Sequence, residues 1–336
     1  MKRTALAAAF SLVPITGMAQ NAVVQDIVDA HILPRFEALA TQSHALEDAA
    51  GQDCTPTSTA LRAAYGDAFD AWIAASHLRF GPTETNDRAF AIAFWPDSRG
   101  ATPRTLNALI QDKDPIVANG AEYAEVSIAA RGFYALEFLL FDDALMVAGD
   151  ADYHCKLVQS ISVDIVATTD AMYGDWQSEY RTTLLTPDPE GVYRSDTEAL
   201  QELFKALSTG LQFTSDMRLG RPLGTFDEPR PTRAEVYRSG RSAAHVGLSL
   251  ESLQDIARRL ASGDAALTAE LNNDFNKART KLDALNDPVF AGVTDPQLRL
   301  RIEVLQQSVD TIRTTVRDGL GPTLGVAAGF NSLDGD

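Results

Sequence analysis

The chain has 336 residues, of which 45% are hydrophobic and 22% are charged, so it can bury a core and is not an intrinsically disordered protein. The length supports one large domain or two. With 29 Lys and Arg against 46 Asp and Glu, the formal net charge is −17, which argues against binding to nucleic acid or to an anionic membrane surface.

The first nineteen residues have the features of an export signal. Lys2 and Arg3 precede an apolar run over residues 5–15, and small residues at positions 17 and 19 mark a cleavage point before Gln20. A membrane anchor is the alternative, but the run is shorter than the ~20 residues that span a bilayer. Since no cysteine lies near the cleavage point, we expect a signal peptide and a soluble periplasmic chain, neither a lipoprotein nor membrane-inserted. Its 27 basic and 46 acidic residues would give a net charge of −19.

Cys54 and Cys155 are the two cysteines of the chain. In an oxidising compartment an even number of cysteines favours a disulfide. This bridge would close a loop of about a hundred residues, which the chain-entropy model values at roughly 4–5 kcal/mol. Two buried free thiols or thiolate metal ligands are the alternatives, and the absence of a CxxC spacing weakens the metal interpretation.

Helical periodicity dominates the rest of the chain. From Leu61 to Ile73 apolar residues recur at the i, i+3, i+4 spacing of a helix that faces a core. Strict alternation is hardly seen, and only residues 89–95 could form a strand. We therefore expect an all-α fold. The same helical spacing returns in four later segments, at residues 158–165, 203–211, 250–260 and 302–316.

Three stretches rich in Gly and Pro interrupt these helices, at residues 80–104, 187–191 and 220–231. Long ordered loops in a compact helical protein are usually functional or pack down as lids. We take the stretch at 187–191 as the boundary between two helical-bundle halves, residues 20–190 and 191–330. An Arg-x-Gly and a proline end a periodic helix in each half, at 78–82 and 218–222, so chance similarity and an internal duplication both stay open.

The segment 131–141, Arg-Gly-Phe-Tyr-Ala-Leu-Glu-Phe-Leu-Leu-Phe, is the first candidate for chemistry. On a helix Tyr134 and Glu137 project from one face, one turn apart. Glu137 is surrounded by apolar residues, so its carboxylate must find a partner or have a raised pKa, because burying an unpaired charge costs several kcal/mol. Two interpretations stay open: a buried ion pair with Arg131 or another arginine, and a ligand or metal contact inside the bundle.

Five motifs in order resemble the imelysin family, exported bacterial proteins first classed as metallopeptidases. The resemblance spans about residues 25–320 and implies one all-helical domain of two bundle-like halves, often linked to iron acquisition. The motifs that carry it lie at 78–82, 94–97, 131–140, 218–223 and 238–242.

The proposed active motif of that family is Gly-x-His-x-x-Glu, and this chain departs from it. Gly132 and Glu137 match, but Tyr134 stands where the motif has histidine. Histidine and glutamate one turn apart can ligate one metal ion, whereas a neutral tyrosine with a pKa near 10 is a far poorer ligand. The substitution argues against peptidase activity, although the family classification keeps a metal contact at Glu137 under consideration.

No other motif restores a catalytic site. The chain lacks a Gly-x-Ser-x-Gly elbow, a Walker A loop and a dinucleotide-binding glycine loop. His77 and His245 could approach a cleft from other helices. No two of the five histidines have the i, i+3 or i, i+4 spacing of a local zinc pair: His31, His44, His77, His154 and His245.

Arginines in the motif segments are the stronger lead. Guanidinium groups of this kind usually tie loops and helix ends to carboxylates. The alternative is an anion site between the halves, with Ser239 among its polar groups and with Trp95 and Tyr237 as an apolar wall. The arginines concerned are Arg79, Arg131, Arg218, Arg221, Arg238 and Arg241.

Together these features predict a periplasmic protein that binds a ligand or a partner in iron or haem acquisition and is not an enzyme. A metal-dependent peptidase that uses Glu137 is the alternative, and a scaffold acting only through protein partners is a third. No cofactor is expected with certainty; iron or haem is the candidate ligand, and an outer-membrane or periplasmic iron-uptake component is the candidate partner. The expected ligand-binding residues are Arg79, Arg131, Tyr134, Glu137, Arg218, Arg238, Ser239 and Arg241.

Overall fold

The computed structural model describes residues 15–118, 120 and 122–326. Most of the expected signal peptide lies outside these residues. Positions 15–19 belong to the first helix, α1 (Ile15–Ile27).

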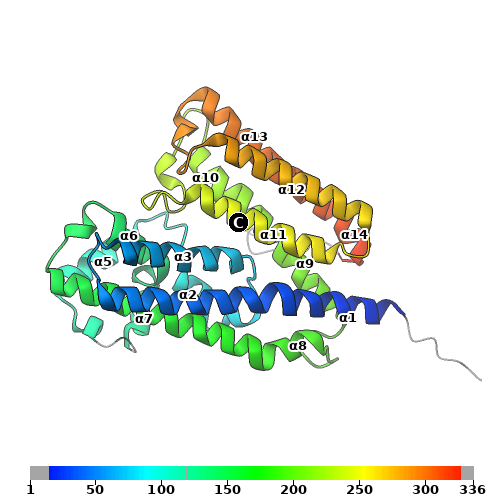
Figure 1. Ribbon diagram of the computed structural model, residues 1–336, viewed down its shortest axis with the longest axis horizontal. Helices are drawn as coiled ribbons and strands as arrows, with labels where there is room; N and C mark the ends of the chain where they lie inside the picture. The colour runs from blue at the N-terminus through cyan, green and yellow to red at the C-terminus, as the bar shows by residue number, and fades with distance from the viewer. Residues whose placement is uncertain (1–14, 119, 121, 327–336) are drawn as a thin grey trace, which may run out of the picture.

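The described residues form helices joined by loops, with no strand among them, which confirms the all-α prediction. Figure 1 shows two groups of helices. Helices α1 and α2 follow one another nearly in one line, so that together they extend past both groups. The first group contains α2 (Leu33–Gln52), α3 (Thr59–Ala75), α6 (Gly132–Phe141) and α7 (Ala151–Asp175). The second group contains α9 (Asp196–Gln212), α11 (Ser242–Leu260), α12 (Ala265–Leu285) and α13 (Pro296–Thr315).

Contact between α3 and α11 brings the two groups together. The stretch at 187–191 lies between α8 (Arg181–Leu185) and α9, where the chain passes from one group to the other. Helix α1 packs against α9 and α11, so the N-terminal helix also links the groups.

Apolar stripes and polar caps explain why these helices form. On α3 the predicted stripe is buried from Leu61 to Ile73. Several helices begin at a side chain that accepts hydrogen bonds from first-turn amides, which satisfies donors that have no partner inside the helix. These caps are Ser58 for α3, Asp150 for α7, Ser195 for α9, Asp264 for α12 and Asp295 for α13.

Residues 89–95, the stretch that could have formed a strand, do not form one. The helix α4 (Arg88–Ile92) occupies most of this stretch and buries Ala89, Ala91 and Ile92. In so short a segment alternating apolar residues fit a single helical turn as well as a strand. The following loop ends at α5 (Ala101–Asp112), whose first amides donate to the Asp97 carboxylate, from Ala101 N at 2.9 Å and from Thr102 N at 2.8 Å.

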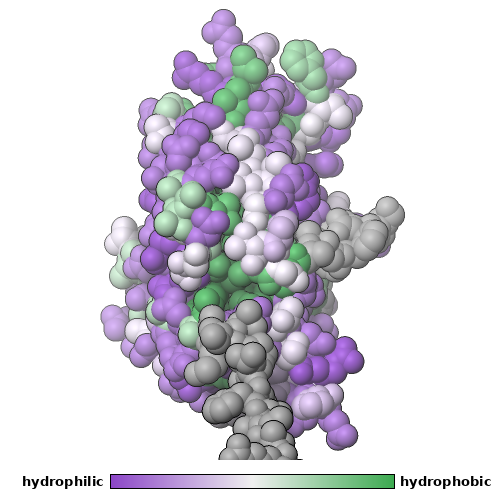
Figure 2. Space-filling model, turned by 90° about the vertical axis from the view of Figure 1, so that its right-hand side faces the viewer, coloured by the Kyte–Doolittle hydropathy of each residue, from purple (hydrophilic) through white to green (hydrophobic). Residues whose placement is uncertain are grey.

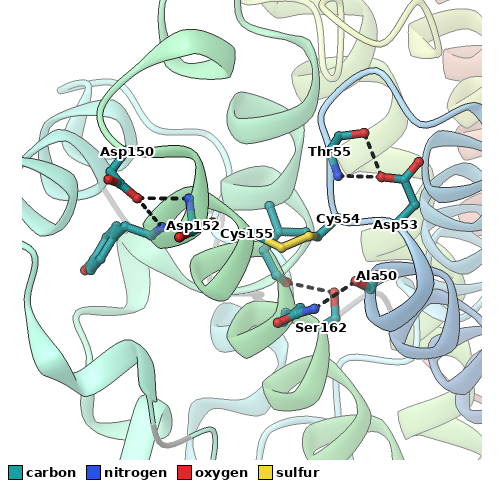
Figure 3. The surroundings of a disulfide bond; sticks show 11 residues. Ala50, Asp53, Cys54, Thr55, Asp150, Asp152, Cys155 and Ser162 are labelled. Atoms are coloured by element: carbon teal, nitrogen blue, oxygen red, sulfur yellow. Dashed lines mark hydrogen bonds between the residues drawn. A yellow bond between two sulfur atoms is a disulfide. The ribbon is translucent and has the colours of Figure 1, made fainter.

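The predicted disulfide is confirmed. Cys54, just after α2, is bonded to Cys155 in the first turns of α7, with Cα atoms 5.1 Å apart (Figure 3). The bridge joins two helices that already pack along each other and lies in the first helix group.

In the described part of the chain four π-helical segments interrupt or extend the helices, and two of them supply residues discussed below. Val28–Ile32 lies between α1 and α2, and Phe213–Leu219 lies between α9 and the short α10 (Gly220–Leu223). A π-helical turn shifts the register of the following side chains, and such turns are frequent at functional sites. The other two are Trp176–Tyr180 and Val316–Leu320, the latter followed by α14 (Gly321–Leu324).

The end of the molecule seen in Figure 2 is largely polar. Figure 2 shows one end of the molecule, where hydrophilic residues predominate and hydrophobic residues are confined to patches between them. Within the described part of the chain, no helix has the length and hydropathy needed to cross a membrane.

Candidate functional site

A cavity of about 350 Å³ lies between the two helix groups. Its walls come from the end of α3, the loop at 93–96, α6, α9, the π-helical segment Phe213–Leu219 and α11. The Trp95 and Tyr134 rings are nearly parallel, with centroids 6.2 Å apart and an angle of 17° between their planes. A concave site that combines aromatic and aliphatic side chains with convergent polar groups is a typical arrangement for a small organic ligand. Its aromatic lining residues are Trp72, Phe90, Trp95, Tyr134 and Phe213.

Three buried polar side chains form part of the cavity wall: Tyr134, Glu235 and Arg218, which we call the triad. The Tyr134 hydroxyl donates to Glu235 Oε1 at 2.5 Å, and Arg218 Nε donates to Glu235 Oε2 at 2.7 Å. Arg218 also donates to Ser249 Oγ on α11 at 2.8 Å and to Ser76 Oγ at the end of α3 at 3.4 Å. The guanidinium therefore connects both helix groups at the cavity.

The triad has a definite charge state. Burial alone would raise the pKa of Glu235, but the Arg218 charge and the hydrogen bond from His245 lower that pKa to about 2. Burial and the neighbouring Glu235 charge raise the pKa of Tyr134 well above 10, so the phenol stays protonated and donates. Glu235 is thus an ionised acceptor held between a cation and a neutral hydroxyl.

Glu137 lies one turn beyond Tyr134 on α6 but in different surroundings. It is 2% exposed and is not among the residues that line the cavity. Its Oε1 accepts hydrogen bonds from Ser239 N at 3.1 Å and from Ser239 Oγ at 3.2 Å. Burial raises the pKa of Glu137 to about 7, although these hydrogen bonds and the charge of Arg238 act in the opposite direction.

The ion pair considered for Glu137 is not formed with Arg131. Two nitrogens of Arg131 donate to the Asp164 carboxylate on α7, at 2.8 and 2.7 Å. Arg238 donates to Asp142 at 2.9 Å and lies over the Phe138 ring. Within the described residues Glu137 is therefore buried with hydrogen-bond donors and without an ion pair.

The motif glycine has a structural role. Gly132 begins α6 with a φ of +71°, and a Cβ atom at this position would lie 2.2 Å from the carbonyl oxygen of Ile92. Only glycine allows both the left-handed conformation and this close approach. Gly132 therefore lets the start of α6 pack against the end of α4, which sets the position of Tyr134 on the cavity wall.

Five of the six motif arginines are tied to carboxylates, and two of the six line the cavity, Arg79 and Arg218. Arg221 lies over the Trp95 ring at 5.5 Å, and its buried Nε has no hydrogen-bond partner. Tyr237 packs under Arg238, outside the cavity lining. The pairs are Arg79–Glu84, Arg131–Asp164, Arg218–Glu235, Arg238–Asp142 and Arg241–Asp70.

The charges that line the cavity balance one another. Its three cations, Arg79, Lys205 and Arg218, are each paired with a carboxylate that also lines it. Such a lining is not a concentrated positive field of the kind that attracts an anion, and it suits a ligand without a large net charge.

The side chains around Glu137 do not fit a resident metal ion. Among the described residues no group of three or more His, Cys, Asp or Glu side chains is arranged to hold one. Tyr134, at the position of the motif histidine, directs its hydroxyl to Glu235, and the two hydrogen bonds from Ser239 occupy one oxygen of Glu137. The donor set is one carboxylate and a protonated phenol, which is not a zinc or iron site.

Comparison with known proteins agrees with this fold. The imelysin (peptidase M75) family model matches residues 32–316. The chain belongs to the imelysin family. The iron-regulated protein A of Synechococcus elongatus is 24% identical over 325 residues, covering 88% of this chain and 84% of that protein.

Two solved structures share the imelysin architecture. An imelysin-like protein from Psychrobacter arcticum is 20% identical and has a TM-score of 0.78, covering 96% of this chain and all of that one. A putative iron-regulated protein A precursor from Parabacteroides distasonis is 14% identical, with a TM-score of 0.76 and coverage of 93% and 98%. At these identities the solved structures establish the fold alone.

Several residues of the site were outside the sequence predictions. Glu235 is the main one, since it holds both Tyr134 and Arg218, from positions 101 and 17 residues away. Its location three residues before the motif at 238–242 is the one signal that could have drawn attention to it. Of the histidines considered, His77 lines the cavity. His245 is not among the lining residues, but its Nδ1 lies 3.3 Å from Glu235 Oε2.

Proposed function

We propose that this imelysin is an exported, non-catalytic binding protein of iron or haem acquisition and that its ligand occupies the cavity between the helix groups. The observation that carries the proposal is the buried triad on the cavity wall. Arg218 holds the two groups together there, and Glu235 fixes the Tyr134 ring beside Trp95. Rings held in this way form a preorganised surface for a flat ligand.

The iron connection rests on the relatives. The similar protein from Synechococcus elongatus carries the name iron-regulated protein A, and the solved structure from Parabacteroides distasonis is described as a putative iron-regulated protein A precursor. An organic iron complex or haem suits the aromatic lining better than a bare iron ion, which needs several free oxygen or nitrogen ligands. Iron would then be the cargo of the ligand, and an outer-membrane or periplasmic iron-uptake component would be the partner that delivers or receives it.

Export and a periplasmic location are supported by two separate features. The N-terminal residues have the pattern of a cleaved signal, and the Cys54–Cys155 bridge is of the kind that persists in oxidising compartments. N-terminal sequencing of the protein from a bacterial periplasmic extract tests this part, with Gln20 as the expected first residue and an unprocessed Met1 as the contrary result.

A non-catalytic role is favoured by the surroundings of Glu137. A peptidase would need this carboxylate to reach a substrate or a metal-bound water, whereas it is enclosed and hydrogen-bonded to Ser239. Metal-dependent cleavage of a peptide library, abolished by Glu137→Gln, would establish the peptidase instead.

Tryptophan fluorescence tests the cavity directly. Trp72 and Trp95 line it, so titration with haem, with ferric citrate and with a ferric hydroxamate should quench the emission for at least one of the three. Thr209→Phe, which would fill part of the cavity without adding a tryptophan to the signal, should weaken or abolish the quenching. Tyr180→Phe is the matched control, because the Tyr180 hydroxyl contacts Tyr193 outside the cavity lining. No binding of any of the three compounds would remove the iron connection.

A further inference from the structure

Two histidines connect the cavity to a carboxylate on α11. His77 follows α3 and lines the cavity, and its Nε2 lies 2.9 Å from Nε2 of His31. His31 belongs to the π-helical segment Val28–Ile32 and is fully buried. Its other nitrogen, Nδ1, lies 2.8 Å from Asp255 Oδ2 on α11. A chain of hydrogen bonds thus runs from Asp255 through His31 to His77.

Asp255 determines which atoms donate in these hydrogen bonds, because its carboxylate stays ionised. Arg258 and Arg259 donate to it at 2.8 and 3.0 Å, and Arg35 lies 3.5 Å away. Burial opposes ionisation, but the hydrogen bonds from His31 and the arginines hold the pKa of Asp255 well below its usual range. An ionised carboxylate can only accept, so His31 Nδ1 must carry a hydrogen.

The tautomer of His77 follows from that of His31. Burial lowers the pKa of His31 to about 4, and burial together with the charges of Arg35 and Arg218 lowers the pKa of His77 well below its ordinary value. Both rings are therefore neutral near pH 7. With its hydrogen on Nδ1, His31 offers the Nε2 lone pair, so His77 donates from Nε2 and keeps a lone pair on Nδ1. Of the two ring nitrogens of His77, Nδ1 is the one left for a ligand.

Neither a metal bridge nor proton transfer explains the pair. Among the described residues no third His, Cys, Asp or Glu ligand joins the two Nε2 atoms to form a metal site. A tetrahedral ion about 2 Å from each would also hold them roughly 3.3 Å apart, and they are 2.9 Å apart. A proton passed along the chain would end on Asp255, beside three arginines that oppose its arrival. The arrangement instead resembles the carboxylate–histidine hydrogen bonds that hold an imidazole in one tautomer and one orientation.

The packing around His77 also holds the ring in place. Helix α9 passes directly over it at Gly210, where a Cβ atom would lie 2.8 Å from the His77 Cβ. One turn of that helix supplies a second polar group, since Thr209 lines the same cavity and its buried Oγ1 has no hydrogen-bond partner. The Thr209 hydroxyl and the lone pair of His77 Nδ1 are thus the two groups left for a ligand.

We propose that His77 anchors the ligand by accepting a hydrogen bond at Nδ1, with the Thr209 hydroxyl as a second contact and Trp95 as the stacking surface. The ligand class is an organic molecule without a large net charge that carries an N–H or O–H donor next to a flat apolar part. His31 and Asp255 are positioning residues for this contact. The inference rests on the proposed function, because it assumes that the cavity is where a ligand binds.

Nitrogen-15 NMR of the imidazole rings tests the tautomers in the full-length protein without a ligand. At pH 7 we expect His77 protonated at Nε2 and bare at Nδ1, and His31 the reverse. Asp255→Asn, which removes the charge but keeps the size, should give a mixture of tautomers at both rings. His77 protonated at Nδ1 in the wild-type protein would overturn the proposal.

A matched pair of probes tests the anchor itself. Phenol has a hydroxyl donor and anisole lacks it, and one hydrogen bond corresponds to roughly a 3- to 10-fold preference for phenol. NMR shifts of the cavity residues should give this ratio for the wild-type protein and for His154→Gln, a histidine outside this cavity. His77→Phe should bring the ratio to about one, and Thr209→Val should reduce it if the larger change fails to fold.

The phenol and anisole measurement and the iron or haem titration test different statements. Equal binding of phenol and anisole to the wild-type protein, or no binding of either, would overturn the anchoring role of His77. The iron or haem titration decides the proposed function independently, because it does not depend on the preference between the probes.

Discussion

Glu137 and Glu235 are both about 2% exposed, but their surroundings differ. Glu137 is part of α6, and Glu235 accepts a hydrogen bond from Tyr134 of the same helix. Glu235 faces the cavity with the Arg218 guanidinium beside it, and its pKa is about 2. Glu137 has hydrogen-bond donors but no paired cation, and its pKa is about 7. Equal burial thus gives opposite pKa shifts, because a charge partner outweighs desolvation in one region and is missing from the other.

The two residues at the family-motif positions of α6 also differ in whether they line the cavity. Tyr134 and Glu137 are three residues apart on one helix, but the first lines the cavity and the second does not. A shared helical face puts two side chains near each other, and the neighbouring elements decide which of them reaches a ligand. Changes at the triad should therefore affect binding, and changes at Glu137 should affect stability alone.

The largest effect should come from removing the charge partner of Glu235. Arg218→Met leaves that carboxylate buried and unpaired, so the free energy of unfolding at pH 7 should fall by about 3–5 kcal/mol. Urea denaturation measures it. The double variant Arg218→Met, Glu235→Gln should recover part of the loss in stability. A loss below about 1 kcal/mol for Arg218→Met alone would mean that the Arg218 charge does not stabilise the buried Glu235 carboxylate.

Removing the disulfide, which lies away from both glutamates, should lower the stability by a comparable amount. Cys54→Ala with Cys155→Ala should lower stability by about 2–5 kcal/mol in non-reducing buffer, because the unfolded chain gains conformational freedom. The melting temperature should fall markedly while ligand affinity at low temperature is unchanged. Two free thiols in the labelled native protein would refute the bridge.

Glu137 should make stability depend on pH. Its pKa is raised from 4.5 to about 7 on folding, so its contribution is fully present below about 4.5 and is lost as the pH rises through 7. At 1.36 kcal/mol per pKa unit the loss is at most about 3 kcal/mol. Glu137→Gln should therefore gain stability relative to the wild-type protein between pH 5 and 8. His31 has a shift of the opposite direction, but it is common to both proteins and cancels in the difference. A difference independent of pH would contradict the raised pKa.

A smaller effect is expected at Tyr134. Tyr134→Phe removes one hydrogen bond from Glu235 and leaves the Arg218 pair, so stability should fall by about 1–2 kcal/mol. Tyr134→His, which restores the histidine of the family motif, should not create metal-dependent peptidase activity, because Glu137 stays hydrogen-bonded to Ser239. A metal-stimulated cleavage of peptides by this variant would show that one substitution separates the two functions.

Much of the fold could be predicted from the sequence, because helical periodicity and the five motifs report local structure. At residues 89–95 the sequence left a strand possible, because a few alternating residues do not distinguish a strand from a short helix, and the chain forms α4 there. The disulfide followed from cysteine number and compartment. The π-helical segments at 28–32 and 213–219 were not predicted, because no residue pattern marks the extra residue in such a turn.

The site was less predictable because its contacts join distant parts of the chain. Arg131 was assigned to the ligand site, yet it is bonded to Asp164, 33 residues away, outside the cavity lining. The His31–His77 contact spans 46 residues, so a search for histidines at helical spacing does not find it. Residue type indicated that Glu137 needs a partner or a shifted pKa, but only the tertiary structure decides between these two outcomes.

The most direct test of the account compares the two glutamates in one binding measurement. Tryptophan fluorescence titrations with the iron compound that binds best should be run on the wild-type protein, Glu235→Gln and Glu137→Gln under identical conditions. The account predicts an affinity reduced about tenfold or more for Glu235→Gln, because the cavity wall loses its organising charge, and an unchanged affinity for Glu137→Gln. Loss of binding in Glu137→Gln with normal binding in Glu235→Gln would contradict it.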